Sequence, residues 1–244
     1  MTRLRAQLDS ARPVALVRLD GALELADAPA AWALLVKLLA DQPDVMVVDL
    51  SSIVVDDPQA LLLFGALARR AGAWPGVPLI LVASVTHLRV ALHRQAVDRQ
   101  VAVCASRDEA MVLAHGAPQP LRLHESLLPI PGAARRGRDL ATEVCLRWQL
   151  PDLVGPASII ASELVTNAVR HAGTPLRLSL ARTARYLHIA VRDEDPHPAV
   201  LQHPSVLATR GRGLLIVQRT ALNWGSTPAP TGKVVWATLP ADAS

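Results

Sequence analysis

Three polar residues recur at every fourth position in the second half of the sequence, namely Glu163, Asn167 and His171. This interval places their side chains one above another on one face of a helix, and apolar residues at helical spacing form another face. Asparagine disfavours a helix interior, because its amide competes with the backbone for hydrogen bonds. The polar face is therefore either an ordinary solvated surface or a reactive one, in which the carboxylate accepts a proton and the amide oxygen anchors Mg²⁺. We interpret His171 as a helix-end or core histidine.

The ten residues 162–171, SELVTNAVRH, resemble the N box of the GHKL ATPase superfamily and are most similar to that of the anti-sigma-factor serine/threonine kinases. The resemblance implies that the chain binds ATP together with Mg²⁺. It further implies that Glu163 is the catalytic base and that Asn167 is the residue that holds Mg²⁺. Because a motif becomes specific only in its context, the neighbouring segments matter.

Two further segments follow in the order that this family has. A predicted strand ends at Asp193, and the resemblance implies that this carboxylate accepts a hydrogen bond from the adenine amino group, as its chemistry allows. The second glycine box is matched by Gly211, Arg212, Gly213 and Leu214. The resemblance implies that the backbone of this box and the start of the helix after it hold the phosphates. A lone Gly-x-Gly is weak, but three segments in the expected order are fairly specific.

The first glycine box of the family is altered in this chain, because Asp195 and His197 stand at its glycine positions. The alteration is compatible with weaker nucleotide binding or with a rearranged loop over the site. Residues 195–210 contain three prolines and no hydrophobic periodicity, which predicts a long loop. Arg212, just beyond it, is either a phosphate contact or an exposed charge. We interpret Lys233, which follows a glycine, as part of a turn.

The first half of the sequence alternates short apolar runs with amphipathic segments, which predicts an α/β layer structure. The predicted strands are residues 14–19, 45–50, 78–83 and 101–104. The predicted helices are residues 30–40, 58–71, 87–95 and 106–115.

This half resembles a STAS domain, the fold of anti-anti-sigma proteins, through the segments 47–51 and 56–61. In phosphorylatable STAS domains the second segment begins a helix, and a helix N-terminus suits a phosphate group. Here the acceptor position is Pro58 and the residue before it is Asp57. Since proline has no hydroxyl, we predict a docking or dimerisation module rather than a phosphorylated switch.

The second half predicts strands at 121–128, 176–181, 186–192 and 234–239, and helices at 133–150, 156–171 and 211–223. A segment with proline and glycine, residues 116–120, separates the two halves and predicts a linker. We therefore predict two domains. The first, residues 1–115, is an α/β STAS-like layer domain, and the second, residues 121–244, is an α+β GHKL (Bergerat) ATP-binding sandwich.

The composition excludes several classes of protein. The chain has 244 residues, of which 51% are hydrophobic, and its net charge is +4 with the arginines scattered singly, so we predict no direct nucleic-acid binding. Cys104 and Cys145 fit neither a metal spacing nor a redox pair. Charged residues interrupt the start of the chain, so no signal peptide is visible there. The longest apolar runs are too short to cross a bilayer. We therefore expect a cytoplasmic protein without membrane contact.

Two functions are compatible with these features. The first is an ATP-dependent protein serine/threonine kinase of the anti-sigma-factor type, which transfers the γ-phosphate to a separate STAS protein in partner-switching control of transcription. The resemblance then implies a sigma factor and an anti-anti-sigma (STAS) protein as partners, and GHKL relatives often form homodimers. The alternative is a non-catalytic module that binds ATP, or no nucleotide at all, and sequesters a partner. The altered first glycine box and Pro58 favour this alternative.

Overall fold

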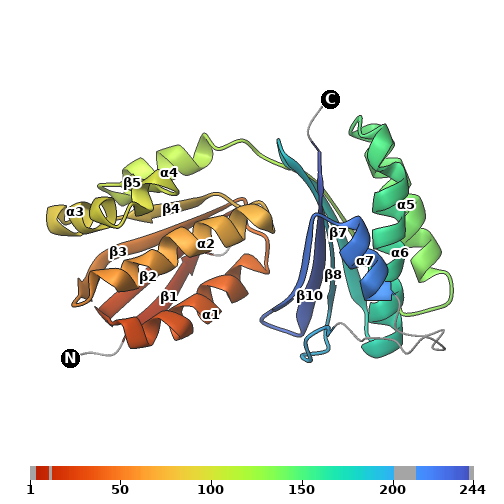
Figure 1. The fold of residues 1–244 in the computed structure, drawn as a ribbon, viewed down its shortest axis with the longest axis horizontal. Coiled ribbons are helices and arrows are strands. Elements are labelled where there is room, and N and C mark those ends of the chain that lie inside the picture. The colour runs from red at the N-terminus through yellow and green to blue at the C-terminus, as the bar shows by residue number, and fades with distance from the viewer. Residues whose placement is uncertain (1–3, 11–12, 201–212, 242–244) are drawn as a thin grey trace. The chain divides into compact units, whose positions relative to one another are not determined.

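The structure, a computed structural model, describes residues 4–10, 13–200 and 213–241. The chain divides into two units, Met1–Gln119 and Pro120–Ser244, and Figure 1 shows a separate sheet in each. The boundary falls inside the segment 116–120, for which the sequence predicts a linker. None of the helices in the described ranges combines the length and the hydropathy that a membrane crossing requires.

The first unit is a sheet with helices on both faces, which confirms the predicted α/β layer structure. Its strand order is β1-β2-β3-β4-β5, in which β1 is antiparallel to β2 and the other neighbours are parallel. The strands are β1 Arg5–Ser10, β2 Val14–Leu23, β3 Val45–Val55, β4 Leu79–Val82 and β5 Ala102–Cys104. The helices are α1 Ala28–Leu39, α2 Leu62–Ala73, α3 Thr86–Arg94 and α4 Arg107–His115.

The central strand β3 is buried along its first six residues, 45–50. Alternate side chains pack with α1, α2 and α3 on one face of the sheet and with α4 on the other. Helices α1 and α2 lie side by side over their face (Figure 1). A strand that is covered on both faces needs apolar side chains at nearly every position, which explains why this segment is an uninterrupted apolar run.

Two strands of the first unit differ from the sequence-based prediction. Strand β2 does not end at residue 19, but continues to Leu23 through a register shift against β3. Gly21 has a φ of 103°, a value that glycine tolerates and L side chains rarely adopt. The strand therefore passes through Gly21 with a local irregularity and does not end there. Strand β1 is not predicted from the sequence, because RAQLDS contains a single large apolar residue.

The side chain of Asp57 caps the segment in which a phosphorylatable STAS domain carries its acceptor. Pro58 begins a short 3₁₀ helix, Pro58–Leu61, which leads into α2, so the helix predicted at 58–71 consists of two elements. The carboxylate of Asp57 accepts a hydrogen bond from the backbone N–H of Gln59 at 2.8 Å. A fixed carboxylate therefore caps the helix N-terminus at which the STAS resemblance places a phosphate.

The second unit is an antiparallel sheet with α5, α6 and α7 on one face (Figure 1), which confirms the predicted α+β sandwich. Its strand order is β6-β7-β8-β10-β9. The strands are β6 Leu121–Leu127, β7 Leu176–Arg182, β8 Tyr186–Asp193, β9 Asn223–Pro228 and β10 Lys233–Pro240. The helices are α5 Ala133–Arg147, α6 Val154–His171 and α7 Gly213–Thr220.

Helix α6 buries its apolar face in the core of the second unit, where Ile160 and Leu164 are at most 1% exposed. Helix α5 approaches it closely at Gly137, because a Cβ at that residue would lie 3.0 Å from Cγ2 of Val165. The packing fixes the rotation of α6 about its axis. It therefore also fixes the direction in which the polar face of the helix points.

The last helix ends earlier than the sequence predicts. The helix predicted to continue to about residue 223 ends at Thr220, and residues 223–228 form the edge strand β9. The sequence of this strand, NWGSTP, has no apolar alternation, so its pairing with β10 is not visible locally. Gly225 lies opposite Trp236 in that pairing, and a Cβ at Gly225 would come within 2.7 Å of the tryptophan ring.

Candidate functional site

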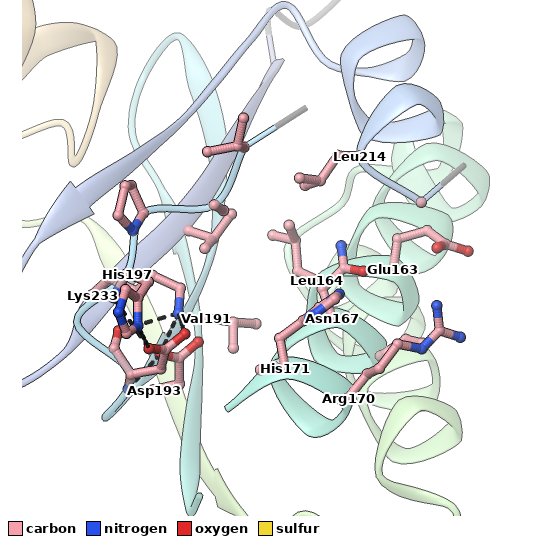
Figure 2. Close-up of a pocket in the computed structure, with 18 of the residues that line it drawn as sticks. Glu163, Leu164, Asn167, Arg170, His171, Val191, Asp193, His197, Leu214 and Lys233 are labelled. Atoms are coloured by element: carbon pink, nitrogen blue, oxygen red, sulfur yellow. Dashed lines mark hydrogen bonds and ion pairs between the residues drawn. The ribbon is translucent and has the colours of Figure 1, made fainter. Parts of the chain in front are cut away.

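A cavity of about 710 Å³ lies between α6, the end of β8 and the start of α7. This volume falls in the range of sites that hold a ligand of nucleotide size. Figure 2 shows Asn167 and Glu163 on the α6 side of the cavity and Asp193 with Lys233 on the strand side. The apolar residues of its lining include Leu164, Val191, Leu214, Ile216 and Val235.

The polar face of α6 forms one wall, and Glu163, Asn167 and His171 all line the cavity. The three side chains share a face because they are four positions apart on the helix, as the sequence predicts. His171 is exposed at the end of the helix. The Nδ2 atom of Asn167 is buried, and no group in the described part of the chain hydrogen-bonds to it. Such a buried amide nitrogen carries an uncompensated desolvation penalty.

Helix α7 begins directly against this wall. A Cβ placed on Gly213 would lie 2.5 Å from Oε2 of Glu163 and 3.3 Å from Oδ1 of Asn167. Any larger residue at this helix start would force the end of the Glu163 side chain to move. Leu214 also lines the cavity, whereas Gly211 and Arg212 lie outside the described residues. The structure thus places half of the predicted second glycine box at the site.

Asp193 forms the opposite wall at the end of β8 and is 2% exposed. Its Oδ1 atom accepts hydrogen bonds from Nζ of Lys233 at 3.0 Å and from the backbone N–H of Asp195 at 3.0 Å. Burial raises the pKa of Asp193, and the hydrogen bond and charge of Lys233 offset part of that rise. The carboxylate is therefore held by Lys233, a partner that the sequence alone does not predict.

The expectation that Lys233 belongs to a turn is wrong. Its side chain is 6% exposed and forms ion pairs with Asp193 at 3.0 Å and with Asp195 at 2.8 Å. Lys233 is the first residue of β10 and lies opposite Asp193 in the pairing with β8. The signal for this role is the alternation of β10, because Lys233 is in phase with Val235 and the other residues that face the helices.

The residues at the altered glycine positions are held by the same cluster. Besides its ion pair with Lys233, the carboxylate of Asp195 accepts a hydrogen bond from the backbone N–H of His197 at 3.1 Å and contacts Nδ1 of its ring at 2.7 Å. The hydrogen bond from Lys233 holds the pKa of Asp195 far below its usual range. Both residues line the cavity. The segment after β8 is therefore fixed by side chains, where the family resemblance places glycines.

Comparison with known proteins gives three findings. No curated protein matches this chain in sequence. The first unit is similar in structure to an anti-sigma factor antagonist from Mycobacterium paratuberculosis, at 19% identity and a TM-score of 0.41 over 46% of this chain and 95% of that one. It is also similar to the anti-sigma factor antagonist SpoIIAA in its unphosphorylated form, at 15% identity and a TM-score of 0.39 over 48% of this chain and 100% of that one.

The third finding concerns the second unit, in which the cavity lies. Residues 130–239 match the family model described as "Histidine kinase-like ATPase domain". The match spans α5, α6, β7, β8, α7, β9 and nearly all of β10, and so includes both walls of the cavity. The second unit of this chain is therefore a histidine kinase-like ATPase domain.

Proposed function

We propose that the second unit binds ATP with Mg²⁺ and transfers the γ-phosphate to a serine or threonine of a separate STAS protein, in partner-switching control of transcription. One observation carries the proposal: Glu163 and Asn167 meet the glycine start of α7 on one wall, while the buried carboxylate of Asp193 lies on the other. This arrangement provides a base, an oxygen for a metal ion, a backbone cradle and an acceptor for a base edge in one cavity.

The residues present fit a metal ion that arrives with its nucleotide. Within the described ranges there is no group of three or more His, Cys, Asp or Glu side chains that could hold a metal by itself. A magnesium ion bound through one amide oxygen, phosphate oxygens and water needs no such group. Asn167 would hold the ion through its amide oxygen, and its Nδ2 has no hydrogen-bond partner among the described residues. When bound, Mg²⁺ supplies positive charge that neutralises the phosphate oxygens.

Asp193 and Gly213 would orient the two ends of the nucleotide. An ionised carboxylate only accepts hydrogen bonds, so Asp193 favours the amino group of adenine. Gly213 exposes the backbone at the start of α7, where free N–H groups and the helix dipole favour phosphate. Glu163, next to Gly213, is then placed to accept the proton of an attacking hydroxyl.

The phosphate acceptor must lie on another protein if it occupies the usual STAS position. In the first unit of this chain that position is Pro58, behind the capping carboxylate of Asp57. We therefore propose a separate anti-anti-sigma (STAS) protein as the substrate and a sigma factor as the second partner, with cytoplasmic location and homodimer formation as parts of the same proposal. The resemblance to anti-sigma-factor kinases supports these assignments.

Titration calorimetry with ATP tests the proposal directly. We expect saturable binding with a Kd below about 1 mM, which corresponds to roughly −4 kcal/mol or better, and we expect the affinity to fall when EDTA removes Mg²⁺. The control titration uses AMP, which has the adenine but lacks the β- and γ-phosphates. Absence of ATP binding at millimolar concentration would contradict the proposed function.

A second candidate function, a docking module without catalysis, is favoured by the cluster of Asp195, Lys233 and His197. Charged side chains there replace the glycines that would let the backbone approach the nucleotide. Radiolabelled ATP with a STAS protein as acceptor separates the two functions. Binding without transfer of label would support the docking module, whereas label on the acceptor supports the kinase.

Replacing Gly213 by alanine should weaken nucleotide binding. The added Cβ would lie 2.5 Å from Oε2 of Glu163, so either this side chain or the start of α7 must move. We expect the Kd for Mg-ATP to rise about tenfold, since small misplacements at a site have large effects. Gly155→Ala is the matched control, because a Cβ on Gly155 of α6 meets no atom within 4 Å. Equal affinities of Gly213→Ala, Gly155→Ala and the wild type would refute this role of Gly213.

A further inference from the structure

We propose that Lys233 is a positioning residue that makes the site selective for adenine over guanine, by holding Asp193 as an ionised acceptor. The inference rests on the proposed nucleotide binding and adds a specificity determinant to it. Lys233 lines the cavity together with Asp193 and Asp195. Figure 2 shows the bonds of Lys233 directed into this cluster on the strand side of the cavity.

The ammonium group of Lys233 has its hydrogen-bonding capacity filled. It donates to Oδ1 of Asp193 at 3.0 Å, to Oδ2 of Asp195 at 2.8 Å and to the backbone oxygen of Asp195 at 3.1 Å. An ammonium has three donors, so these acceptors use all of them. A buried charge is tolerated only when it is paired and hydrogen-bonded in this way. The geometry therefore favours a charged lysine beside a charged Asp193.

The backbone fixes Lys233 at this place. Strands β10 and β8 pair Lys233 with Asp193 directly. The preceding residue, Gly232, has a φ of 71°, and a Cβ there would lie 2.0 Å from the backbone oxygen of Asp193. Gly232 therefore lies close against the end of β8, where no larger residue would fit.

The hydrogen bonds leave one carboxylate oxygen of Asp193 for a ligand. Both hydrogen bonds to its carboxylate end on Oδ1, and within residues 4–10, 13–200 and 213–241 no group donates to Oδ2. An ionised carboxylate can accept from the amino group of adenine, whereas the carbonyl oxygen of guanine would face it acceptor to acceptor. A protonated carboxyl group has a donor and would tolerate that carbonyl. Selectivity therefore depends on the charge state of Asp193.

Several charged groups influence the charge state of Asp193. Asp195 and Lys233 contact Asp193, with His197 bonded to Asp195, while Glu163, Arg170 and His171 line the cavity from α6. Without the lysine, Asp193 would be buried next to the negative charge of Asp195, and both conditions favour the protonated form. Removal of Lys233 should therefore shift Asp193 toward the form that accepts guanine.

The test is Lys233→Met, which keeps an unbranched side chain of similar length and removes the charge. The measurement is Kd for Mg-ATP and Mg-GTP at pH 6, 7 and 8. We expect the wild type to prefer ATP at each pH. In the variant, the ratio of the GTP Kd to the ATP Kd should fall at least tenfold at pH 6 and recover as the pH rises. A role in folding alone would weaken the binding of both nucleotides equally. A Kd ratio that is unchanged and independent of pH would overturn the inference.

Two further variants complete the experiment. Lys37→Met, at an exposed position of α1, removes the only other lysine of the chain and should leave both affinities unchanged. If Lys233→Met does not fold, Lys233→Gln is neutral but still donates hydrogen bonds, and it should show the same pH-dependent loss of selectivity. Retention of the wild-type ratio in Lys233→Gln would equally overturn the inference. Failure of the wild type to bind either nucleotide would instead refute the proposed function on which the inference rests.

Discussion

Glu163→Gln is expected to leave the affinity for Mg-ATP within about twofold of the wild type and to slow phosphate transfer by about 10²- to 10⁴-fold, the usual contribution of a general base. The amide has the size of the carboxylate, so its contact with the start of α7 at Gly213 is preserved. It cannot accept the proton of the attacking hydroxyl. The measurement is single-turnover transfer of labelled phosphate to a STAS acceptor, with Kd obtained separately by calorimetry.

The control for this experiment is Glu143→Gln on α5. Glu143 is an exposed residue paired with Arg147 one turn away, and it lies outside the cavity lining. Exposed pairs of this kind contribute little to stability, so transfer should be unchanged. Residual transfer by Glu163→Gln equal to that of Glu143→Gln would show that Glu163 is not the base. Transfer would then depend on positioning and electrostatics alone.

The fold and one wall of the site are predictable from the sequence, because both follow from local periodicity. The spacing of Glu163, Asn167 and His171 defines a helix face, and the packing of α6 leaves that face at the cavity. Runs of apolar residues likewise indicate the buried strands of both sheets. In these cases the information needed lies within one element.

The other wall depends on contacts between elements and is harder to predict. Lys233 resembles a turn residue when only its neighbours in sequence are considered, and its partner Asp193 is 40 residues away. Strand β9 is polar, and its pairing with β10 alone makes it a strand. The cluster of Lys233, Asp193 and Asp195 arises from the register of β8 against β10, which no local pattern specifies. The residues that replace the family's glycines become interpretable only once this register is known.

Asn167→Ala is expected to raise the Kd for Mg-ATP by about ten- to a hundredfold, the effect of removing one bond to a charged group. The remaining affinity for ATP should be insensitive to EDTA, because the affinity that is lost is the magnesium-dependent part. The chain supplies a matched control in its only other asparagine, the exposed Asn223 at the start of β9. Asn223→Ala should bind Mg-ATP as the wild type does.

The nucleotide-free stability of Asn167→Ala provides an independent measurement. Because the buried Nδ2 of Asn167 has no partner among the described residues, its removal relieves a desolvation penalty, and alanine is the better helix former. We therefore expect the thermal midpoint without nucleotide to stay the same or rise, while a given concentration of Mg-ATP stabilises the variant less than the wild type, since that stabilisation grows with ligand concentration over Kd. A variant that is less stable without nucleotide yet stabilised by Mg-ATP as strongly as the wild type would assign Asn167 to the structure of α6 rather than to the metal. The opposite pattern, greater stability with weakened binding, is what a residue retained for function should give.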